Sequence, residues 1–271
     1  MIYDTVIIGG GPAAVSAALT LRARNKTVAI VSGGVDDIPL SRSHKIANYP
    51  GMPDVSGRDM LLAMEKQAAD AGAELIRGRA TSVMNMGDSF GVAVGNDFWQ
   101  SRTVILCTGV KAGNAFPGEK ELLGRGVSYC VTCDGMLYKG RDVCLVGFTS
   151  DTEAEAELLR DMGCRVQLFT KKNAGYAIEG EKKVTALRVG EQSYPCDAVF
   201  ILRSGTAPDT LLDGLEMDGA HIKVDQSLCT SVPGVFAAGD CTGAPYQVAK
   251  AVGDGNVAAL SAAKYMEESK A

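Results

Sequence analysis

Residues 3–31, YDTVIIGGGPAAVSAALTLRARNKTVAIV, set the expected architecture. Residues 3–8 and 27–31 are rich in β-branched and apolar side chains, which is typical of parallel strands buried on both faces. Between them, three glycines precede an alanine-rich run over residues 12–24 that predicts a helix. The order strand, glycine turn, helix and strand predicts a βαβ unit at the start of a doubly wound α/β fold.

The glycine turn matches the spacing G-x-G-x-x-A, with Gly9, Gly11 and Ala14 at the specified positions. Gly9 permits a tight turn, Gly11 lets a pyrophosphate approach the backbone, and Ala14 allows the helix to lie close to the strand. Pro12 and Ala13 begin the helix, whose free N–H groups favour a phosphate. The turn therefore predicts dinucleotide binding, and the alternative is an ordinary tight turn.

Length and composition indicate a globular protein of two domains. The 271 residues exceed the about 100–200 that one core needs, and hydrophobic residues make up 46%, which excludes a disordered chain. The 27 basic and 32 acidic residues give a net charge of −5 without a basic block, so binding to nucleic acid is not expected. The sequence contains no run of about 18 apolar residues, so it does not predict a membrane span. Most of the cysteines are isolated, which favours a reducing, cytoplasmic compartment.

A second βαβ pattern occupies the middle of the chain, at residues 142–146, 152–162 and 165–169. Before it, residues 81–101 alternate loosely, which suggests a small antiparallel meander, and residues 103–107 follow as a buried strand. The expected organisation is a discontinuous first domain that the second interrupts, with the bounds 1–113, 114–207 and 208–271.

Cys130 and Cys133 form a C-x-x-C pair that Asp134 follows directly. The spacing alone is a weak signal, but a structural zinc site would need two more ligands, and the chain has only two isolated histidines. We therefore favour a redox-active dithiol over half of a zinc site or two inert thiols, and we expect no metal. Asp134 is suited to hold the proton that leaves one sulfur, and its alternative role is that of a turn or capping residue.

Five segments carry a family resemblance. They are IIGGGPAAVSAAL (7–19), IANYPGMPDVSG (46–57), ILCTG (105–109), GRGVSYCVTCDGMLYKG (124–140) and GVFAAGDCTGAPYQVAKAVGDGNVAALSAAKYM (234–266). With them the chain resembles the low-molecular-weight flavoprotein thioredoxin reductases over nearly its whole length. The resemblance implies two Rossmann-like three-layer α/β domains, of which the FAD-binding domain is discontinuous and the nucleotide-type domain carries the C-x-x-C. Only 106 residues lie between Cys133 and Asp240, so the second domain is expected to be trimmed.

The same resemblance implies the site residues. FAD would be held by Gly9, Gly11, Pro12, Ala13, Ala14, Ser32, Asn48, Ala80, Thr108, Gly109, Gly239, Asp240, Gln247 and Val248. Ser32 departs from the pattern, because this fold usually has an acid there for the ribose hydroxyls. Asp240 would take the ribityl hydroxyls. Cys133 would face the flavin, Cys130 would attack thioredoxin, and Asp134 would act as acid and base.

The second βαβ unit lacks the NADPH pattern of that family. The turn after its first strand consists of Gly147, Phe148, Thr149, Ser150 and Asp151. Only the first glycine of a second G-x-G-x-x-A remains, and several acids follow where a phosphate would be repelled. Ser150 or Asp151 can also cap the helix itself. Lys171 and Lys172 stand in place of an arginine-containing cluster for a 2′-phosphate, so the sequence predicts loss of NAD(P)H binding.

Without NAD(P)H the enzyme needs another electron donor, and a flavin can accept electrons singly. The whole chain resembles the ferredoxin-dependent flavin thioredoxin reductases, which implies ferredoxin as donor, thioredoxin as acceptor and a homodimer. Ferredoxins are usually acidic, so Arg42, His44, Lys45 and Arg58 are candidates for a basic docking patch, against a scattered solvated surface. Two other functions stay open: an NAD(P)H-dependent thioredoxin reductase with an atypical nucleotide site, and a non-enzymatic FAD and disulfide redox sensor.

Overall fold

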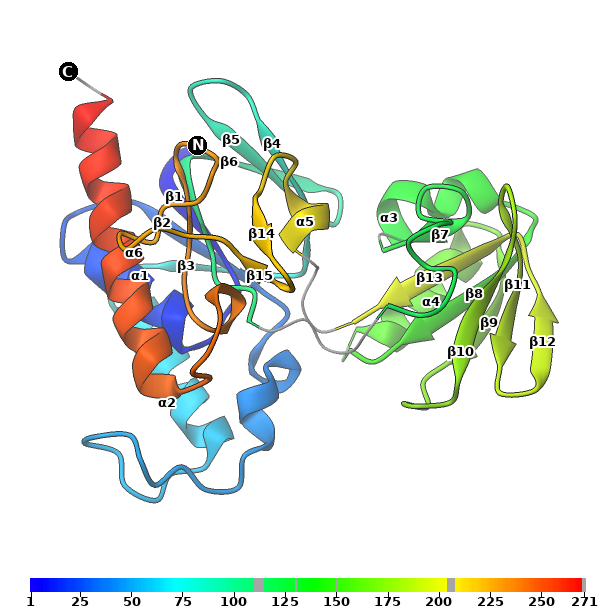
Figure 1. Ribbon diagram of the computed structural model, residues 1–271, viewed down its shortest axis with the longest axis horizontal. Coiled ribbons are helices and arrows are strands. Elements are labelled where there is room, and N and C mark those ends of the chain that lie inside the picture. The colour runs from blue at the N-terminus through cyan, green and yellow to red at the C-terminus, as the bar shows by residue number, and fades with distance from the viewer. Residues whose placement is uncertain (110–114, 130, 150, 204–207, 270–271) are drawn as a thin grey trace. The chain divides into compact units, whose positions relative to one another are not determined.

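The computed structural model describes residues 1–109, 115–129, 131–149, 151–203 and 208–269. The chain divides into two compact units, Met1–Lys111 with Gly205–Ala271 (unit 1) and Ala112–Ser204 (unit 2), as Figure 1 shows. The expected boundaries at 113/114 and 207/208 fall inside or beside segments outside the described residues, so their exact positions stay a prediction. The expected α/β class with parallel sheets and two Rossmann-like domains is confirmed.

Unit 1 is built on one sheet in which strands distant in sequence pair. In spatial order β3, β2, β1, β6, β5 and β4, the strands are Glu74–Arg77, Val28–Ser32, Ile2–Ile8, Asp97–Leu106, Phe90–Val94 and Ala80–Asn85. A further strand, β16 (Val235–Ala237), also pairs with β6. The strands β3, β2, β1, β6 and β16 run parallel, whereas β5 is antiparallel to both β4 and β6.

One strand differs from expectation. The sequence separates a meander at residues 81–101 from a buried strand at 103–107, but β6 is a single strand over Asp97–Leu106. The first half of β6 pairs with β5 and its last residues pair with β16, so one strand serves both the meander and the parallel sheet. Its carboxyl end therefore lies between those of β1 and β16.

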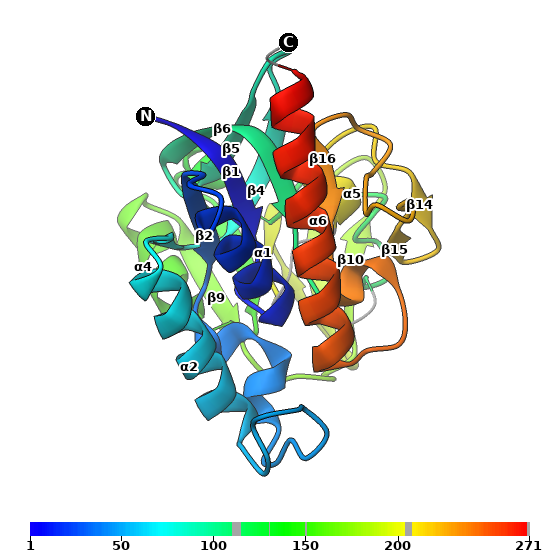
Figure 2. The same cartoon turned by 90° about the vertical axis from the view of Figure 1, so that its left-hand side faces the viewer.

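Three long helices cover one face of this sheet: α1 (Pro12–Arg22), α2 (Gly57–Asp70) and α6 (Val248–Glu268). Figure 2 shows α1 lying between α2 and α6. Ile7 of β1 packs in the core under these helices, whereas Val6 and Ile8 pack in a second core on the opposite face, because successive strand residues point to opposite sides. The short elements α5 (Pro208–Leu211), β14 (Met217–Asp218) and β15 (His221–Ile222) complete unit 1.

The close packing of α1 against α6 gives a stability prediction. A Cβ atom at Gly255 would lie 2.1 Å from the backbone oxygen of Ala13, whereas one at Gly253 would have no atom within 4 Å. We expect Gly255→Ala to lower the free energy of unfolding by about 1–3 kcal/mol, because the two helix backbones must separate. Gly253→Ala, on the same helix, should raise it by about 0.5–1 kcal/mol through better helix propensity. Urea unfolding checks both signs, and equal effects of the two substitutions would contradict the contact.

Unit 2 contains a parallel sheet with the order β7, β13, β8 and β9, formed by Val127–Ser128, Ala198–Leu202, Asp142–Gly147 and Arg165–Phe169. The helix α4 (Thr152–Asp161) connects β8 to β9, as the second βαβ pattern predicts. After β7 come α3 (Val131–Asp134) and a short 3₁₀ helix (Gly135–Tyr138).

The sequence did not predict the second sheet of unit 2. Its antiparallel strands are β10 (Tyr176–Gly180), β11 (Val184–Val189) and β12 (Gln192–Pro195). Ile178 and Leu187 from this sheet are buried in one cluster with Val199 of the parallel sheet. Lysines and glycines interrupt the apolar alternation in this segment, so the strand pattern is weak in the sequence alone.

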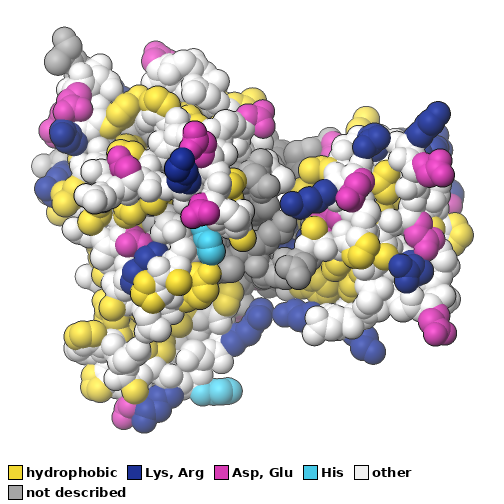
Figure 3. All heavy atoms as spheres, viewed as in Figure 1, with side chains coloured by type: hydrophobic (Ala, Val, Ile, Leu, Met, Phe, Trp, Pro, Cys, Tyr) yellow, Lys and Arg dark blue, Asp and Glu magenta, His cyan; other side chains and the backbone are white. Residues whose placement is uncertain are grey.

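The helices within the described ranges are all too short or too polar to cross a membrane. On the face shown in Figure 3, basic and acidic side chains are interspersed. Of the candidate basic residues, Lys45 forms an ion pair with Asp54 at 2.9 Å and Arg58 forms one with Asp36 at 3.0 Å. Because acids already accompany two of the four candidates, a scattered solvated surface describes this region better than a basic patch.

Candidate functional site

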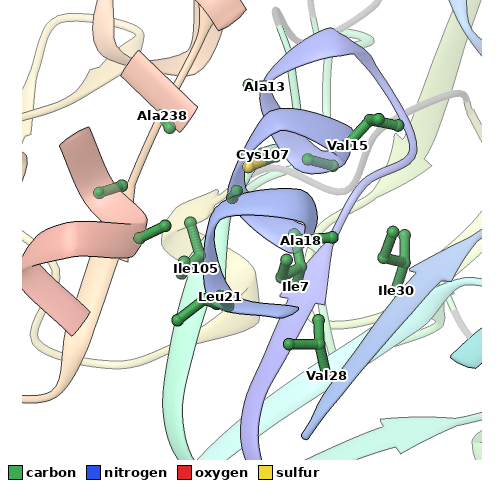
Figure 4. Close-up of a cluster of buried hydrophobic side chains, with 14 of the residues drawn as sticks. Ile7, Ala13, Val15, Ala18, Leu21, Val28, Ile30, Ile105, Cys107 and Ala238 are labelled. Carbon is green, nitrogen blue, oxygen red and sulfur yellow. The ribbon is translucent and has the colours of Figure 1, made fainter. Parts of the chain in front are cut away.

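The glycine turn after β1 forms an open cradle at the N-terminus of α1. Gly9 has a φ of +120°, and a Cβ atom there would lie 2.1 Å from the backbone oxygen of Cys107, so only glycine fits. Figure 4 shows Cys107 close to Ala13 in the buried cluster behind the turn. Gly11 precedes the helix without a side-chain cap, and a Cβ atom there would have no atom within 4 Å. The helix therefore begins uncapped beside open space, with Pro12 as its first residue, as a phosphate site requires.

Ser32, the last residue of β2, lies against this turn. Its hydroxyl accepts a hydrogen bond from the backbone N–H of Gly34 at 3.1 Å, and a Cβ atom at Gly10 would lie 2.4 Å from its oxygen. The acid that follows in the chain, Asp36, is engaged in its ion pair with Arg58. The structure thus places Ser32, the last residue of β2, beside the glycine turn.

Three adjacent strands of unit 1 end at the same edge of the sheet. Ile8 of β1 and Ala237 of β16 are at the register of Leu106 in β6, so the segments that follow start close together. These segments are the glycine turn, Thr108 with Gly109, and Gly239 with Asp240. Asp240 Oδ1 is buried and has no hydrogen-bond partner among the described residues, whereas the Thr108 side chain meets the Cys241 thiol. Since buried polar atoms nearly always have a partner, Asp240 Oδ1 fits a ligand group at the carboxyl edge of the sheet.

Asn48 and Gln247 are distant in the sequence but meet in unit 1. Asn48 Nδ2 donates a hydrogen bond to Gln247 Oε1 at 2.8 Å. Gln247 stands directly before α6 and Val248 is the first residue of that helix, so the bond joins the loop of Asn48 to the start of α6. Ala80, another predicted FAD residue, opens β4 and is buried.

The dithiol segment follows β7 in unit 2. Cys130 lies outside the described residues, and for Cys133 the structure describes only the backbone within α3. Asp134, the last residue of α3, accepts a hydrogen bond from the buried hydroxyl of Ser128, with 2.6 Å between the two oxygens. Ser128 was not predicted from the sequence, although its place at a strand end just before the cysteine pair was a signal. This hydrogen bond orients the carboxylate of Asp134.

A buried ion pair anchors the residue before Cys130. Glu119 and Arg203 are joined by two hydrogen bonds of 2.6 Å. Glu119 also accepts hydrogen bonds from the Phe116 N–H at 2.7 Å and from the Tyr129 hydroxyl at 3.0 Å. Burial raises the pKa of the Glu119 carboxyl, but the hydrogen bonds and the charge of Arg203 outweigh burial and lower it. Tyr129 directly precedes Cys130, so a charged and fully paired network fixes the start of the dithiol segment.

Side chains gather at the carboxyl ends of β8 and β9 in unit 2. Phe148 follows β8 and packs near Tyr176, with ring centroids 6.1 Å apart. Tyr176 in turn contacts Phe169, the last residue of β9, at 6.4 Å. A Cβ atom at Gly147 would lie 2.2 Å from the side chain of Thr152. The carboxyl ends of β8 and β9 therefore face an aromatic cluster and a threonine rather than bare backbone.

The N-terminus of α4 is engaged by its own chain. The Thr149 N–H donates to the Thr152 hydroxyl at 3.2 Å, and the Thr149 hydroxyl donates to the carboxylate of Asp151. Asp151, one of the two predicted capping residues, occupies the N-cap position of α4 without a side-chain capping bond. Its carboxylate is turned to Thr149, and Ser150 lies outside the described residues. With glutamates in the first turn of α4, this end carries negative charge where a phosphate needs positive potential.

Within the ranges that the structure describes, no group of three or more His, Cys, Asp or Glu could hold a metal ion. The free cysteines with described side chains are Cys107, Cys144, Cys164, Cys196, Cys229 and Cys241. Burial raises the pKa of Cys107 and Cys241, so these thiols are poor nucleophiles although they lie near the glycine turn and Asp240.

Comparisons with known proteins agree with this geometry. The family model for pyridine nucleotide-disulphide oxidoreductases matches residues 3–172 and 148–255. The thioredoxin reductase of Listeria monocytogenes is 31% identical in an alignment of 307 positions, gaps included, which covers 99% of this chain and 95% of the relative. That of Aquifex aeolicus is 34% identical in an alignment of 277 positions, which covers 88% of this chain and 85% of the relative.

Solved structures give the same assignment. A ferredoxin-flavin thioredoxin reductase from Clostridium acetobutylicum superposes with a TM-score of 0.90 at 36% identity, covering 100% of this chain and 99% of that chain. A thioredoxin reductase from Gloeobacter violaceus superposes with a TM-score of 0.85 at 32% identity, covering 99% and 95%.

The cofactor follows from family and fit together. Members of this family are FAD-binding flavoproteins, which confirms the FAD predicted from the sequence. The open cradle at Gly11 suits its pyrophosphate, and the unpartnered carboxylate oxygen of Asp240 suits a ligand hydroxyl. The chain therefore belongs to the pyridine nucleotide-disulphide oxidoreductase family, as an FAD-binding disulfide reductase of the thioredoxin reductase type.

Proposed function

We propose that this protein passes electrons from reduced ferredoxin to thioredoxin, by way of FAD and a disulfide between Cys130 and Cys133. The observation that carries the proposal is the N-terminus of α4, where Thr149 and Thr152 bond each other and acidic side chains gather, so the free N–H groups and positive charge that a nucleotide's phosphates need are lacking. Similarity to the ferredoxin-flavin enzyme of Clostridium acetobutylicum supports the same donor. A protein donor needs no nucleotide site, which agrees with this arrangement.

Unit 1 would hold the cofactor through its own polar groups. When bound, FAD can accept electrons singly and pass two of them to a disulfide. The uncapped start of α1 offers N–H groups to the pyrophosphate, and Asp240 offers a carboxylate oxygen to the ribityl hydroxyls. The hydrogen bond between Asn48 and Gln247 fixes the loop and the start of α6 against each other.

The dithiol would carry out thiol exchange. The Cys130 thiolate attacks the thioredoxin disulfide, so a mixed disulfide forms and one thioredoxin sulfur leaves and takes a proton. Cys133 then attacks the sulfur of Cys130, which releases the second thioredoxin sulfur and leaves a disulfide between Cys130 and Cys133. Asp134, oriented by Ser128, accepts the proton of the attacking thiol and returns it to the leaving sulfur. Met136 and Leu137, 57% and 73% exposed, give a protein partner apolar contacts next to this segment.

Two further features belong to the proposal. We expect a homodimer, which sedimentation equilibrium of the purified protein checks. Free thiols at six positions fit a reducing, cytoplasmic compartment better than an oxidising one.

Anaerobic turnover tests the proposed reaction. With photochemically or enzymatically reduced ferredoxin, catalytic amounts of the protein should form two thiols per thioredoxin, counted with a thiol reagent. Omission of ferredoxin is the control. A redox sensor would reduce at most one thioredoxin, and so form at most two thioredoxin thiols, per protein molecule, because it has no means of turning over.

Asp240 gives a prediction about cofactor affinity. Asp240→Ala should raise the dissociation constant of FAD about 10- to 100-fold, because a hydrogen bond to a charged group contributes about 1.5–3 kcal/mol. The measurement is titration of the FAD-stripped protein, followed by flavin fluorescence. Asp70→Ala is the control, since Asp70 is exposed on α2 and pairs with Lys66 in the same helix. An unchanged dissociation constant in Asp240→Ala would remove Asp240 from the site.

A further inference from the structure

Lys250 in the first turn of α6 makes contacts that were not predicted from the sequence and have no part in the proposed function. Its ammonium donates hydrogen bonds to the backbone oxygen of Gly239 at 2.9 Å, the hydroxyl of Thr242 at 3.0 Å and the backbone oxygen of Gly243 at 2.9 Å. It also lies 2.8 Å from a carboxylate oxygen of Asp254, one turn further along the helix. One cation thus ties α6 to both ends of the turn that runs from Gly239 to Gly243.

Asp254 completes this attachment. The same carboxylate oxygen that contacts Lys250 accepts a hydrogen bond from the backbone N–H of Gly239 at 3.1 Å. The two side chains are only 21% and 18% exposed, so solvent screens them little. Gly239 has a φ of +87°, a conformation that suits glycine and disfavours other residues. The Asp254 carboxylate therefore accepts from the N–H of Gly239, and the backbone oxygen of Gly239 accepts from Lys250 as well as from the N–H and hydroxyl of Thr242.

The pair is poorly explained as a helix-stabilising ion pair. A cation in the first turn faces the positive end of the helix dipole, which is unfavourable for helix stability. A second pair on α6, Lys264 with Glu268, has the same spacing but is 75% and 68% exposed and 3.7 Å apart. Only the pair of Lys250 and Asp254 reaches out of the helix to another segment through several backbone groups.

The turn that this pair holds carries Asp240. Burial raises the pKa of Asp240, the charge of Lys250 acts to lower it, and the Asp254 carboxylate acts to raise it. Lys250 therefore favours the ionised carboxylate that ligand hydroxyls require. The Oδ1 atom of Asp240 is buried and unpartnered in the described structure, so the turn, rather than a hydrogen bond of this atom, sets the direction of the carboxylate.

We propose that Lys250 and Asp254 are positioning residues for FAD, which act by holding the Gly239–Gly243 turn so that Asp240 is already placed for the ribityl hydroxyls. Preorganisation of this kind strengthens binding because the ordering of the turn is completed before the ligand arrives. The inference rests on the proposed role of Asp240.

The test is a double-mutant cycle on FAD affinity. Lys250→Met keeps the length of the side chain without its charge, and Lys264→Met is the matched control on the same helix. In the FAD-stripped full-length protein, Lys250→Met should raise the dissociation constant for FAD at least about tenfold, and Lys264→Met less than about twofold. In the Asp240→Ala background, Lys250→Met should cause a clearly smaller further loss, because both residues act through one carboxylate.

The outcomes separate this inference from the proposed role of Asp240. If Asp240→Ala itself leaves FAD affinity unchanged, the role of Asp240 fails. If Asp240→Ala weakens binding but Lys250→Met does not, or if the two losses multiply fully, Lys250 does not act through Asp240 and the inference is overturned. Far-UV circular dichroism of the stripped variants checks folding. Should Lys250→Met not fold, Lys250→Arg and Asp254→Asn decide: intermediate affinities support the positioning role, and wild-type affinity in both contradicts it.

Discussion

Cys130→Ser and Cys133→Ser are each expected to abolish thioredoxin reduction while FAD stays bound. Thiol exchange needs a thiolate to attack and a second thiolate to resolve the mixed disulfide, and a serine hydroxyl does neither near neutral pH. Loss of such a nucleophile lowers turnover by at least about 10³-fold. The residues expected to hold FAD all belong to unit 1, so we expect neither substitution to lower the FAD content.

The matched control for the two substitutions is Cys229→Ser. Cys229 is a free and partly exposed thiol of unit 1 that has no place in the proposed exchange. The Cys229→Ser variant should reduce thioredoxin at the wild-type rate. The measurement is thiol formation in anaerobic assays with the same donor for all three variants. Wild-type turnover in either C-x-x-C variant would assign the exchange to other thiols, and reveal the pair as inert or as zinc ligands.

The parts of the fold that the sequence predicted are those set by local chemistry. The apolar strand before Gly9, the glycines themselves and the alanine-rich helix after them specify a βαβ unit within about thirty residues. The second βαβ unit, from β8 to β9, was predictable for the same reason. The degenerate turn after β8 was visible as Phe148 and Thr149 where glycine belongs, although the sequence did not say that Phe148 packs near Tyr176.

The parts that the sequence did not predict depend on contacts between distant segments. Ser128 is unremarkable in the sequence, and only the placement of α3 against the end of β7 brings it to Asp134. The attachment of Lys250 to the Gly239–Gly243 turn requires the actual orientation of α6. Likewise, residues 97–101 pair with β5 and residues 104–106 with β16, and no local periodicity indicates that one strand can serve both.

The second large effect concerns the electron donor: NADPH and NADH should fail to reduce the flavin, whereas reduced ferredoxin should reduce it. Each carboxylate within about 4 Å of a phosphate costs on the order of 1–4 kcal/mol, depending on the local dielectric, and α4 begins with several acids. The backbone N–H of Thr149 already donates to the Thr152 hydroxyl, whereas a pyrophosphate would need such an N–H group. Phe148 places a side chain after β8, where a nucleotide site needs bare backbone. These effects act on nucleotide binding only, so they leave a protein donor unaffected.

The most direct test is anaerobic stopped-flow mixing of the oxidised, FAD-loaded protein with each donor, followed by the loss of flavin absorbance. An ordinary NADPH-dependent thioredoxin reductase serves as the positive control for the nucleotide solutions, and dithionite shows that the flavin of this protein can be reduced. The account predicts prompt bleaching by reduced ferredoxin, and none by saturating NADPH or NADH on the same time scale. Prompt and saturable bleaching by either nucleotide would contradict the expected loss of nucleotide binding in unit 2 and return the protein to the NAD(P)H-dependent enzymes.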